Sequence, residues 1–144
     1  MTPKLATAPL NQTMAELPEL VPVQRIERIW VFPPRFVGEV ETGLLVLALG
    51  PEGEGGGEDV DRREVVTVRY EVRGGKGAPP LSRELTGHGW APSARVPQLI
   101  AGVVRRLGGE EEEPLTEEIG GDPERLARFA EALATGAVDR PNGE

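Results

Sequence analysis

This chain of 144 residues contains no cysteine and one histidine, and its formal net charge is −8. Without cysteine it forms no disulfide and has no catalytic thiol, and one histidine cannot complete a structural zinc site, which takes four nitrogen or sulfur ligands. Residues 22–107 hold 12 Lys or Arg against 11 Asp or Glu, whereas residues 108–144 hold 3 Arg against 11 acids. We therefore expect a nearly neutral folded block followed by an acidic C-terminal arm.

The first 22 residues mix proline, alanine, threonine and leucine without helical or strand periodicity. This predicts a flexible N-terminal tail over residues 1–22. The segment has no continuous apolar stretch of the kind that a secretory signal requires. The longest apolar run of the chain, from Leu44 to Leu49, has six residues and is far too short to span a membrane. These features predict a soluble, cytoplasmic protein with no membrane partner.

Four stretches predict β-strands, because they are rich in β-branched or aromatic residues or alternate between apolar and polar residues. The second stretch is apolar on both faces from Leu44 onward, which is typical of a central strand covered on both sides. The third alternates with a period of two, so its apolar side chains share one face. That apolar face consists of Val66, Val68, Tyr70 and Val72. The four predicted strands cover residues 25–32, 39–49, 63–72 and 81–86.

Two helices are predicted after the strands. Residues 93–107 carry apolar side chains at helical spacing on a single stripe, with Ser93 as the expected N-cap and a pair of glycines as the stop. The second helix is expected to begin at Asp122 and Pro123, since an acidic N-cap followed by proline is a common helix start. It should end near residue 136.

The order of these elements, β-β-β-β-α-α, predicts an α+β fold. Strands gathered before helices suggest an antiparallel four-stranded meander with the two C-terminal helices packed on one face. The first helix is expected to cover the apolar face of the third strand. The predicted organisation is a flexible tail (1–22), a main α+β domain (23–108), an acidic linker (109–121), a C-terminal helix (122–136) and a disordered tail (137–144).

His88 is the only candidate for general acid–base chemistry. Two glycines flank it, but no nucleophile motif stands nearby, because neither Ser82 nor Ser93 lies in a Gly-x-Ser-x-Gly sequence. A loop or capping role is therefore the alternative reading. The glycine-rich stretches 53–57 and 74–77 match neither the dinucleotide-binding pattern nor the P-loop, so both are read as hairpin loops. No catalytic residue, cofactor or metal site is expected.

Arginine and tryptophan side chains supply the candidate binding residues. Arg63, Arg69 and Arg73 share the polar face of the third strand, while Arg28 lies on the first strand and Arg95 in the first turn of the first helix. Ordinary cross-strand ion pairs are the alternative explanation for the strand arginines. Trp90, in the irregular segment that also holds His88, is expected in the core unless it is exposed as an anchor for a partner. The candidate binding residues are Arg28, Arg63, Arg69, Arg73, His88, Trp90 and Arg95.

The acidic arm contains four consecutive acids, Glu110, Glu111, Glu112 and Glu113. The run lacks the residue spacing of a calcium loop. It is either a solvated linker between the two helices or an electrostatic handle for a basic partner.

Three classes of function remain open from the sequence. The first is a small non-catalytic interaction protein, an accessory subunit or adaptor that binds another protein. The second is a nucleic-acid-associated regulator in which the arginine face binds and the acidic arm competes. The third is a small ligand-binding domain or enzyme centred on His88. The oligomeric state is open, because the first strand could be a free edge or could pair with a second copy.

Overall fold

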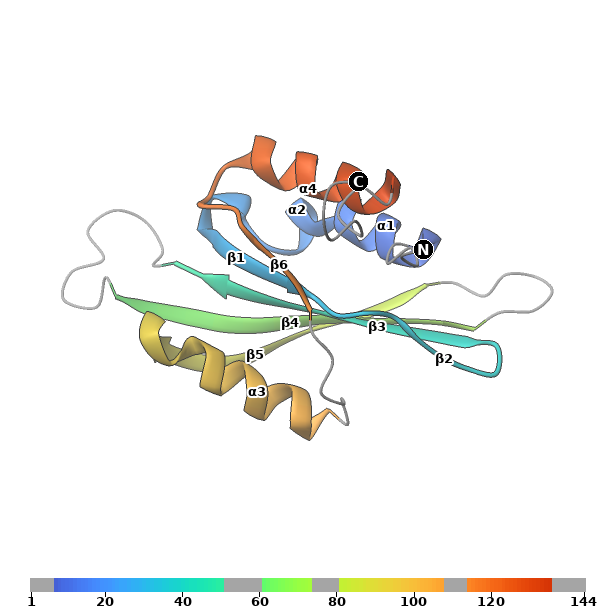
Figure 1. The fold of residues 1–144 in the computed structure, drawn as a ribbon, viewed down its shortest axis with the longest axis horizontal. Helices are drawn as coiled ribbons and strands as arrows, with labels where there is room; N and C mark the ends of the chain where they lie inside the picture. The colour runs from blue at the N-terminus through green and yellow to red at the C-terminus, as the bar shows by residue number, and fades with distance from the viewer. Residues whose placement is uncertain (1–6, 51–60, 74–80, 108–113, 136–144) are drawn as a thin grey trace, which may run out of the picture.

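A computed structural model describes residues 7–50, 61–73, 81–107 and 114–135. Within these ranges the chain forms four α-helices, two 3₁₀ turns and six strands (Figure 1). In chain order the strands are β1 (Ile26–Val31), β2 (Arg35–Val37), β3 (Val40–Leu49), β4 (Arg62–Arg73), β5 (Ser82–Pro92) and β6 (Leu115–Glu118). The α-helices are α1 (Ala8–Ala15), α2 (Leu17–Leu20), α3 (Val96–Arg106) and α4 (Pro123–Thr135), and the 3₁₀ turns are Val23–Arg25 and Ser93–Arg95.

The strands form one antiparallel sheet in the order β5-β4-β3-β1-β6, and β2 pairs with β3. The prediction of an α+β fold with an antiparallel sheet is therefore confirmed, but the sheet has six strands rather than four. β1 lies between β3 and β6, so it is not an edge strand. The long β5 and the short β6 end this row of strands, and β2 lies beside β3 as a further edge strand.

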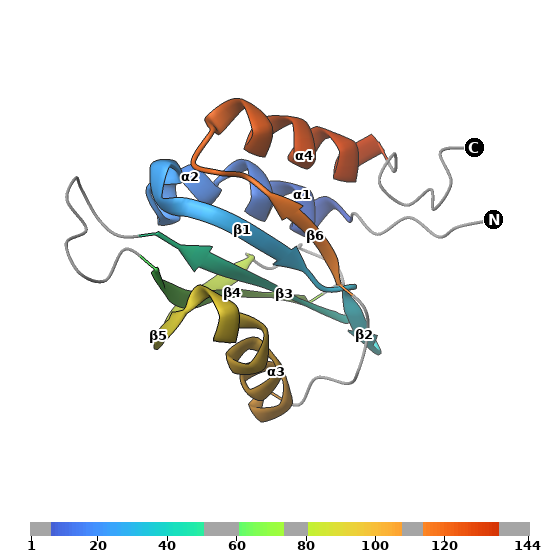
Figure 2. The same cartoon turned by 60° about the vertical axis from the view of Figure 1, so that its left-hand side comes forward.

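Helices cover both faces of the sheet. Figure 2 shows α3 beneath the sheet, whereas α1, α2 and α4 lie above it. The prediction that both C-terminal helices pack on one face is wrong. The physical reason lies in β3 and β4, whose central residues are buried on both faces, so that each face needs its own cover. We call the two faces the α3 side and the α4 side.

The larger core fills the α4 side. Apolar side chains of α1, α2 and α4 pack there on alternate residues of the central strands. Val66, Val68 and Tyr70 belong to this core, so the expectation that the helix over residues 93–107 covers them is wrong. The buried members of this core are Leu10, Met14, Leu17, Val21, Val23, Ile26, Ile29, Val31, Leu45, Leu47, Leu49, Val66, Val68, Tyr70, Ile119, Leu126, Phe129 and Leu133.

The smaller core lies between α3 and the other face of the sheet. Val96 and Ile100 of α3 contact buried residues that alternate with those of the larger core. Val65 and Thr67 of β4 are buried on this side, so the middle of the strand face predicted to point outward lies in the interior. The strand residues of this core are Trp30, Phe32, Val46, Ala48, Val65 and Ala91.

The segment predicted as an extended N-terminal tail instead contains α1 and α2. The Thr7 side chain caps α1 by accepting a 3.3 Å hydrogen bond from the backbone N–H of Leu10, and a proline occupies the first turn. Leu10, Met14 and Leu17, spaced four and three residues apart, point into the larger core. The apolar stripe is only three residues long and has a proline on either side, at positions 9 and 18, so the sequence pattern does not identify it as helical.

The segment predicted as an acidic linker over residues 109–121 contains β6, which pairs antiparallel with β1. Its sequence, Leu-Thr-Glu-Glu, has little strand character of its own, and its pairing depends on the long-range contact with β1. Ile119 follows β6 and is fully buried, which fixes the chain before α4 begins. The glutamates 110–113 and the predicted tail 137–144 lie outside the described residues.

The observed helix boundaries agree well with those predicted from the sequence. α4 begins at Pro123, as predicted, and the Asp122 carboxylate accepts a 2.9 Å hydrogen bond from the backbone N–H of Glu124. The predicted helix 93–107 opens as a 3₁₀ turn and becomes α-helical at Val96. Ser93 does not cap it, because its hydroxyl donates to Asp61 at 2.6 Å.

Candidate functional site

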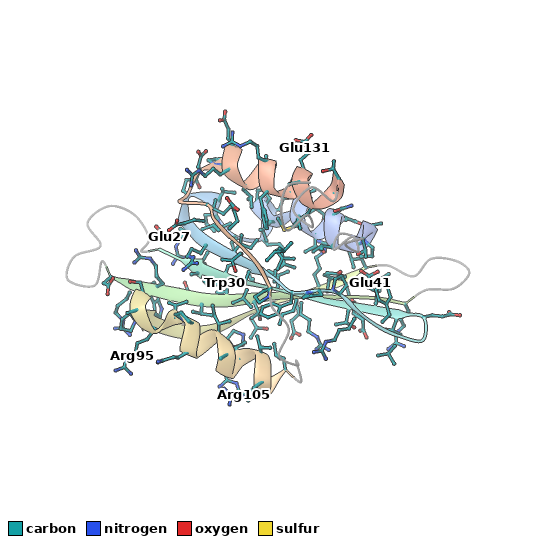
Figure 3. The ribbon with its side chains drawn as sticks, in the orientation of Figure 1. Glu27, Trp30, Glu41, Arg95, Arg105 and Glu131 are labelled. Carbon is teal, nitrogen blue, oxygen red and sulfur yellow. The ribbon has the colours of Figure 1, made fainter. Side chains whose placement is uncertain are left out.

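The helices on the two sides of the sheet differ in charge. On the α3 side, the only charged residues of α3 and its preceding 3₁₀ turn are Arg95, Arg105 and Arg106, and all three are exposed. On the α4 side, α4 carries acidic residues as well as arginines. Figure 3 shows Arg95 and Arg105 pointing away from the sheet near opposite ends of α3, while Glu131 points outward from α4. The outer surface of α3 and its preceding turn therefore carries three positive charges and no negative charge.

Arg105 and Arg106 were not among the sequence candidates, although Arg95 was. Both stand in the last turn of α3, where arginine also interacts favourably with the negative end of the helix dipole. The sequence could have identified them. The helical spacing of the apolar residues leaves positions 105 and 106 off the buried face, so both arginines are expected to face solvent.

His88 lies on the α3 side, half-buried on β5. Its Nε2 atom lies 3.0 Å from the hydroxyl oxygen of Thr67 on the neighbouring strand β4. Partial burial, together with the positive charge of Arg106, lowers the pKa of His88 below its ordinary value of 6.5. The imidazole of His88 is therefore neutral at neutral pH.

Neither serine of the chain stands ready to act with His88. The Ser82 hydroxyl donates to the backbone carbonyl of Glu71 at 3.1 Å, and the Ser93 hydroxyl donates to Asp61. Within the described residues, no three His, Asp or Glu side chains lie close enough together to hold a metal ion. The described surroundings of His88 therefore favour a hydrogen bond between two strands over a catalytic role.

Trp90 is 45% exposed but lies on the opposite side of the sheet from His88. The pairing of β4 with β5 shifts register between Glu64 and Val66, and Gly89, with φ of 104°, supplies the backbone conformation for this bulge. Trp90 consequently faces the α4 side opposite Glu64, where the Arg25 guanidinium lies 5.9 Å from the centre of its ring. His88 and Trp90 do not form one site.

The strand arginines do not form one surface either. Arg28 lies over the Trp30 ring at 5.2 Å, and Arg63 lies 4.0 Å from a carboxylate oxygen of Glu27. These two residues are engaged in contacts within the fold. Arg73 is exposed at the end of β4, while Arg69, also exposed, lines a pocket on the α3 side.

A buried polar network lies on the α4 side. The Tyr70 hydroxyl donates to a carboxylate oxygen of Glu41 at 2.8 Å, and the Thr7 hydroxyl donates to the same oxygen. Glu41 is 7% exposed, so these two hydroxyls compensate for the loss of water around its carboxylate. Burial, supported by the neighbouring Glu41, raises the pKa of Tyr70 above its ordinary value of 10.0. The network joins the start of α1 to the sheet.

Comparisons with known proteins give no relative for this chain. No protein-family model matches the sequence, and neither the curated proteins nor the solved structures yield a similar chain. No helix of the described ranges has both the length and the apolar character needed to cross a membrane. The functional argument therefore depends on the geometry of this molecule alone.

Proposed function

We propose that this protein is a non-catalytic interaction module whose α3 side binds an acidic surface of a protein partner, in the manner of an accessory subunit or adaptor. The observation that carries the proposal is the set of exposed arginines along α3, a helix that has no acidic residue to offset them. Complementary charge of this kind steers association and selects partners. A cysteine-free chain is suited to the cytoplasm, which we propose as the compartment.

The arrangement of aromatic rings favours a protein over single-stranded nucleic acid as the partner. Proteins that bind single strands stack bases on exposed aromatic rings beside basic residues. On the α3 side, Trp30 and Phe32 are each only 9% exposed beneath the helix. Phe36 and Trp90 are exposed, but their strand registers place them on the α4 side.

The test is co-purification of the tagged protein from its own host, followed by mass spectrometry. We compare the parent with a double variant on α3, Arg95→Ala with Arg105→Ala. The matched control removes two exposed arginines from α4, Arg125→Ala with Arg128→Ala. The expected result is a stoichiometric acidic protein that is retained by the parent and the α4 variant, released by moderate salt and lost from the α3 variant. Equal retention by both variants would contradict the proposal.

Recovery of nucleic acid in the same experiment would favour the second candidate, a nucleic-acid-associated regulator with a competing acidic arm. Deleting residues 109–144 cannot test this candidate, because the deletion also removes β6 and α4 from the larger core. Replacing glutamates 110–113 with glutamine keeps both elements. If the arm competes with nucleic acid, this change raises the affinity for nucleic acid, and the gain diminishes as salt is added.

The third candidate, a small enzyme or ligand-binding domain centred on His88, makes a separate prediction. His88→Ala should abolish its activity or binding while the fold remains intact. The contact of His88 with Thr67 favours a structural role instead.

A further inference from the structure

The edge strand β5 has one side that no described strand covers. β4 pairs with β5 on one side, and β5 ends the row of strands on the other. From Ser82 to Gly87 the pairing with β4 is regular, and the register shifts only after Gly87. The outer backbone N–H and C=O groups of this stretch therefore form a template for a further strand. The binding surface proposed above, on α3, does not use this edge.

The regular stretch of β5 lacks the features that commonly protect an edge strand. Such edges are often shielded by lysine, by proline or by a bulge. Residues 82–87 contain neither lysine nor proline, and the bulge lies beyond them. Its two charged residues are placed against residues of the same chain, because Arg83 forms an ion pair with Glu16 and Glu84 stands directly opposite Arg69 on β4.

An apolar side chain is exposed in the middle of this edge. Leu85 stands directly opposite Val68 and therefore lies on the α4 side. The buried strand residues of the larger core come from β1, β3 and β4, and none comes from β5. Leu85 is consequently 46% exposed. A partner strand with an apolar residue at the same position would cover it, which is favourable by roughly 25 cal/mol per Å² of apolar surface.

We propose that two copies of this chain pair antiparallel through β5, about a twofold axis at Leu85, so that their two sheets join into one. Directly opposed residues of an antiparallel pair share a face of the sheet, so the axis passes through a residue position. With the axis at Leu85, residue 83 lies opposite residue 87 of the second copy, and residue 84 lies opposite residue 86. Leu85 then meets its own copy on the α4 side.

The sequence of β5 is self-complementary in this register. Residues 83–87 all lie within the regular stretch, and each charged residue is opposite Thr86 or Gly87 of the second copy, so no like charges oppose each other. An axis at Glu84 would place two carboxylates opposite each other, and an axis at Thr86 would extend the pairing into the bulge. Because both copies use the same edge, the assembly closes at two chains.

Sedimentation analysis of the full chain tests the proposal, at protein concentrations from about 1 μM to about 1 mM, which cover weak as well as tight contacts. We expect a monomer–dimer equilibrium with no larger species. Leu85→Lys should weaken the dimer about tenfold or more, because two positive charges replace an apolar pair at the axis. Val37→Lys is the matched control, since Val37 is 78% exposed on another edge strand, β2, and it should leave the equilibrium unchanged.

Thermal melts check that both lysine variants fold, and both substitutions are at exposed positions. A chain that stays monomeric over the whole range, a species larger than the dimer, or equal dimerisation by the two variants would contradict the proposal.

Cross-linking tests the register, because the chain has no cysteine of its own. In Leu85→Cys the two thiols lie on opposed residues, with Cβ atoms about 5 Å apart, so oxidation should give a covalent dimer. Gly87→Cys is the control on the same face, because its two copies lie four residues apart along the strands, roughly 14 Å and beyond the reach of a disulfide. A Cβ at Gly87 comes no nearer than 4.0 Å to the Glu64 carboxylate, so this variant should fold. Equal cross-linking by the two variants would overturn the assigned register.

This dimer is independent of the partner proposed above. The α3 variant Arg95→Ala with Arg105→Ala should dimerise like the parent, because neither residue lies on β5. A loss of dimerisation in that variant would place the contact between copies on α3 and would contradict the assignment to β5.

Discussion

The two helical layers of this protein are built differently, although they cover the same sheet. On the α4 side, three helices pack on the larger core, and a buried carboxylate accepts hydrogen bonds from hydroxyl groups of the α1 N-cap and of β4. On the α3 side, one helix covers a smaller core and leaves arginines and an open pocket at the surface. The comparison suggests that the α4 side chiefly maintains the fold, whereas the α3 side is available for binding.

The largest effect on stability is expected from a substitution that tests whether α3 is part of the cooperative fold. Ile100→Asp places a carboxylate in the smaller core, where Ile100 is 6% exposed. A buried, unpaired charge is among the changes that cost more than about 4 kcal/mol, so we expect the domain to unfold. Chemical denaturation checks this. Ala101→Asp, at the neighbouring exposed position, is the control and should cost about 1 kcal/mol or less, because aspartate only lowers the helix propensity there. A native-like melt for Ile100→Asp would show that α3 can detach without loss of the fold.

The next largest effect on stability is expected from a substitution that tests whether α1 belongs to the core of the α4 side. Leu10 is 1% exposed, and its truncation to alanine should destabilise the protein by about 2–5 kcal/mol. Gln12→Ala, on the exposed face of the same helix, should cost less than about 0.5 kcal/mol. If Leu10→Ala is equally harmless, α1 contributes nothing to stability and the asymmetry between the two sides disappears.

A smaller effect tests the buried network on the α4 side. Tyr70→Phe removes a hydroxyl that donates to the buried Glu41 carboxylate, so we expect a loss of about 1–3 kcal/mol in denaturant unfolding. A loss below the error of the measurement would mean that Glu41 is adequately solvated without this hydroxyl.

The phenol of Tyr70 gives a second measurement on the same network. Tyr70 is the only tyrosine in the chain, so phenolate absorbance reports on it alone. Because its pKa is raised in the folded state, absorbance should stay low at pH 10, where an exposed phenol is half ionised. The unfolded chain releases the phenol proton near pH 10 and the folded chain retains it, so stability should fall as the pH rises above 10. Half ionisation in the folded protein at pH 10 would contradict the buried placement.

The smallest effect concerns the only histidine, on the α3 side. An NMR titration should give His88 a pKa below 6.5, and Arg106→Gln should raise it toward that value. Arg105→Gln is the matched control and should have less effect. The unfolded chain binds the imidazole proton more readily than the folded chain, so stability should decline slightly as the pH falls below 6.5. An unchanged pKa in Arg106→Gln would show that Arg106 does not act on His88.

The sequence predicted those features of the fold that depend on residues close together along the chain. The central strands followed from alternation and apolar runs, and the start of α4 followed from its Asp-Pro cap. β6 was not predicted, because its four residues pair with β1 only after the chain returns from α3. The choice of face for each helix was also missed, since both faces of the central strands are apolar and the local pattern does not distinguish them.

The candidate site was predicted only in part, for the same reason. Arg95 and His88 were identified, and both lie on the α3 side. Trp90 was grouped with His88, but the bulge at Gly89 places it on the opposite face. The open edge at β5 was not predicted, because the first strand was expected at the edge of the sheet and the order of the strands is set only in the folded protein.

The packing of α1 against α4 has a consequence for the synthesis of the chain. On the ribosome, residues 8–15 emerge well before residues 123–135, the helix that completes their core. The α3 layer is complete once residue 106 has emerged, so the nascent protein can close that face first. Until β6 and α4 follow, the other apolar face of the sheet is only partly covered and the edge of β1 is unpaired, so the growing chain is open to aggregation at both places.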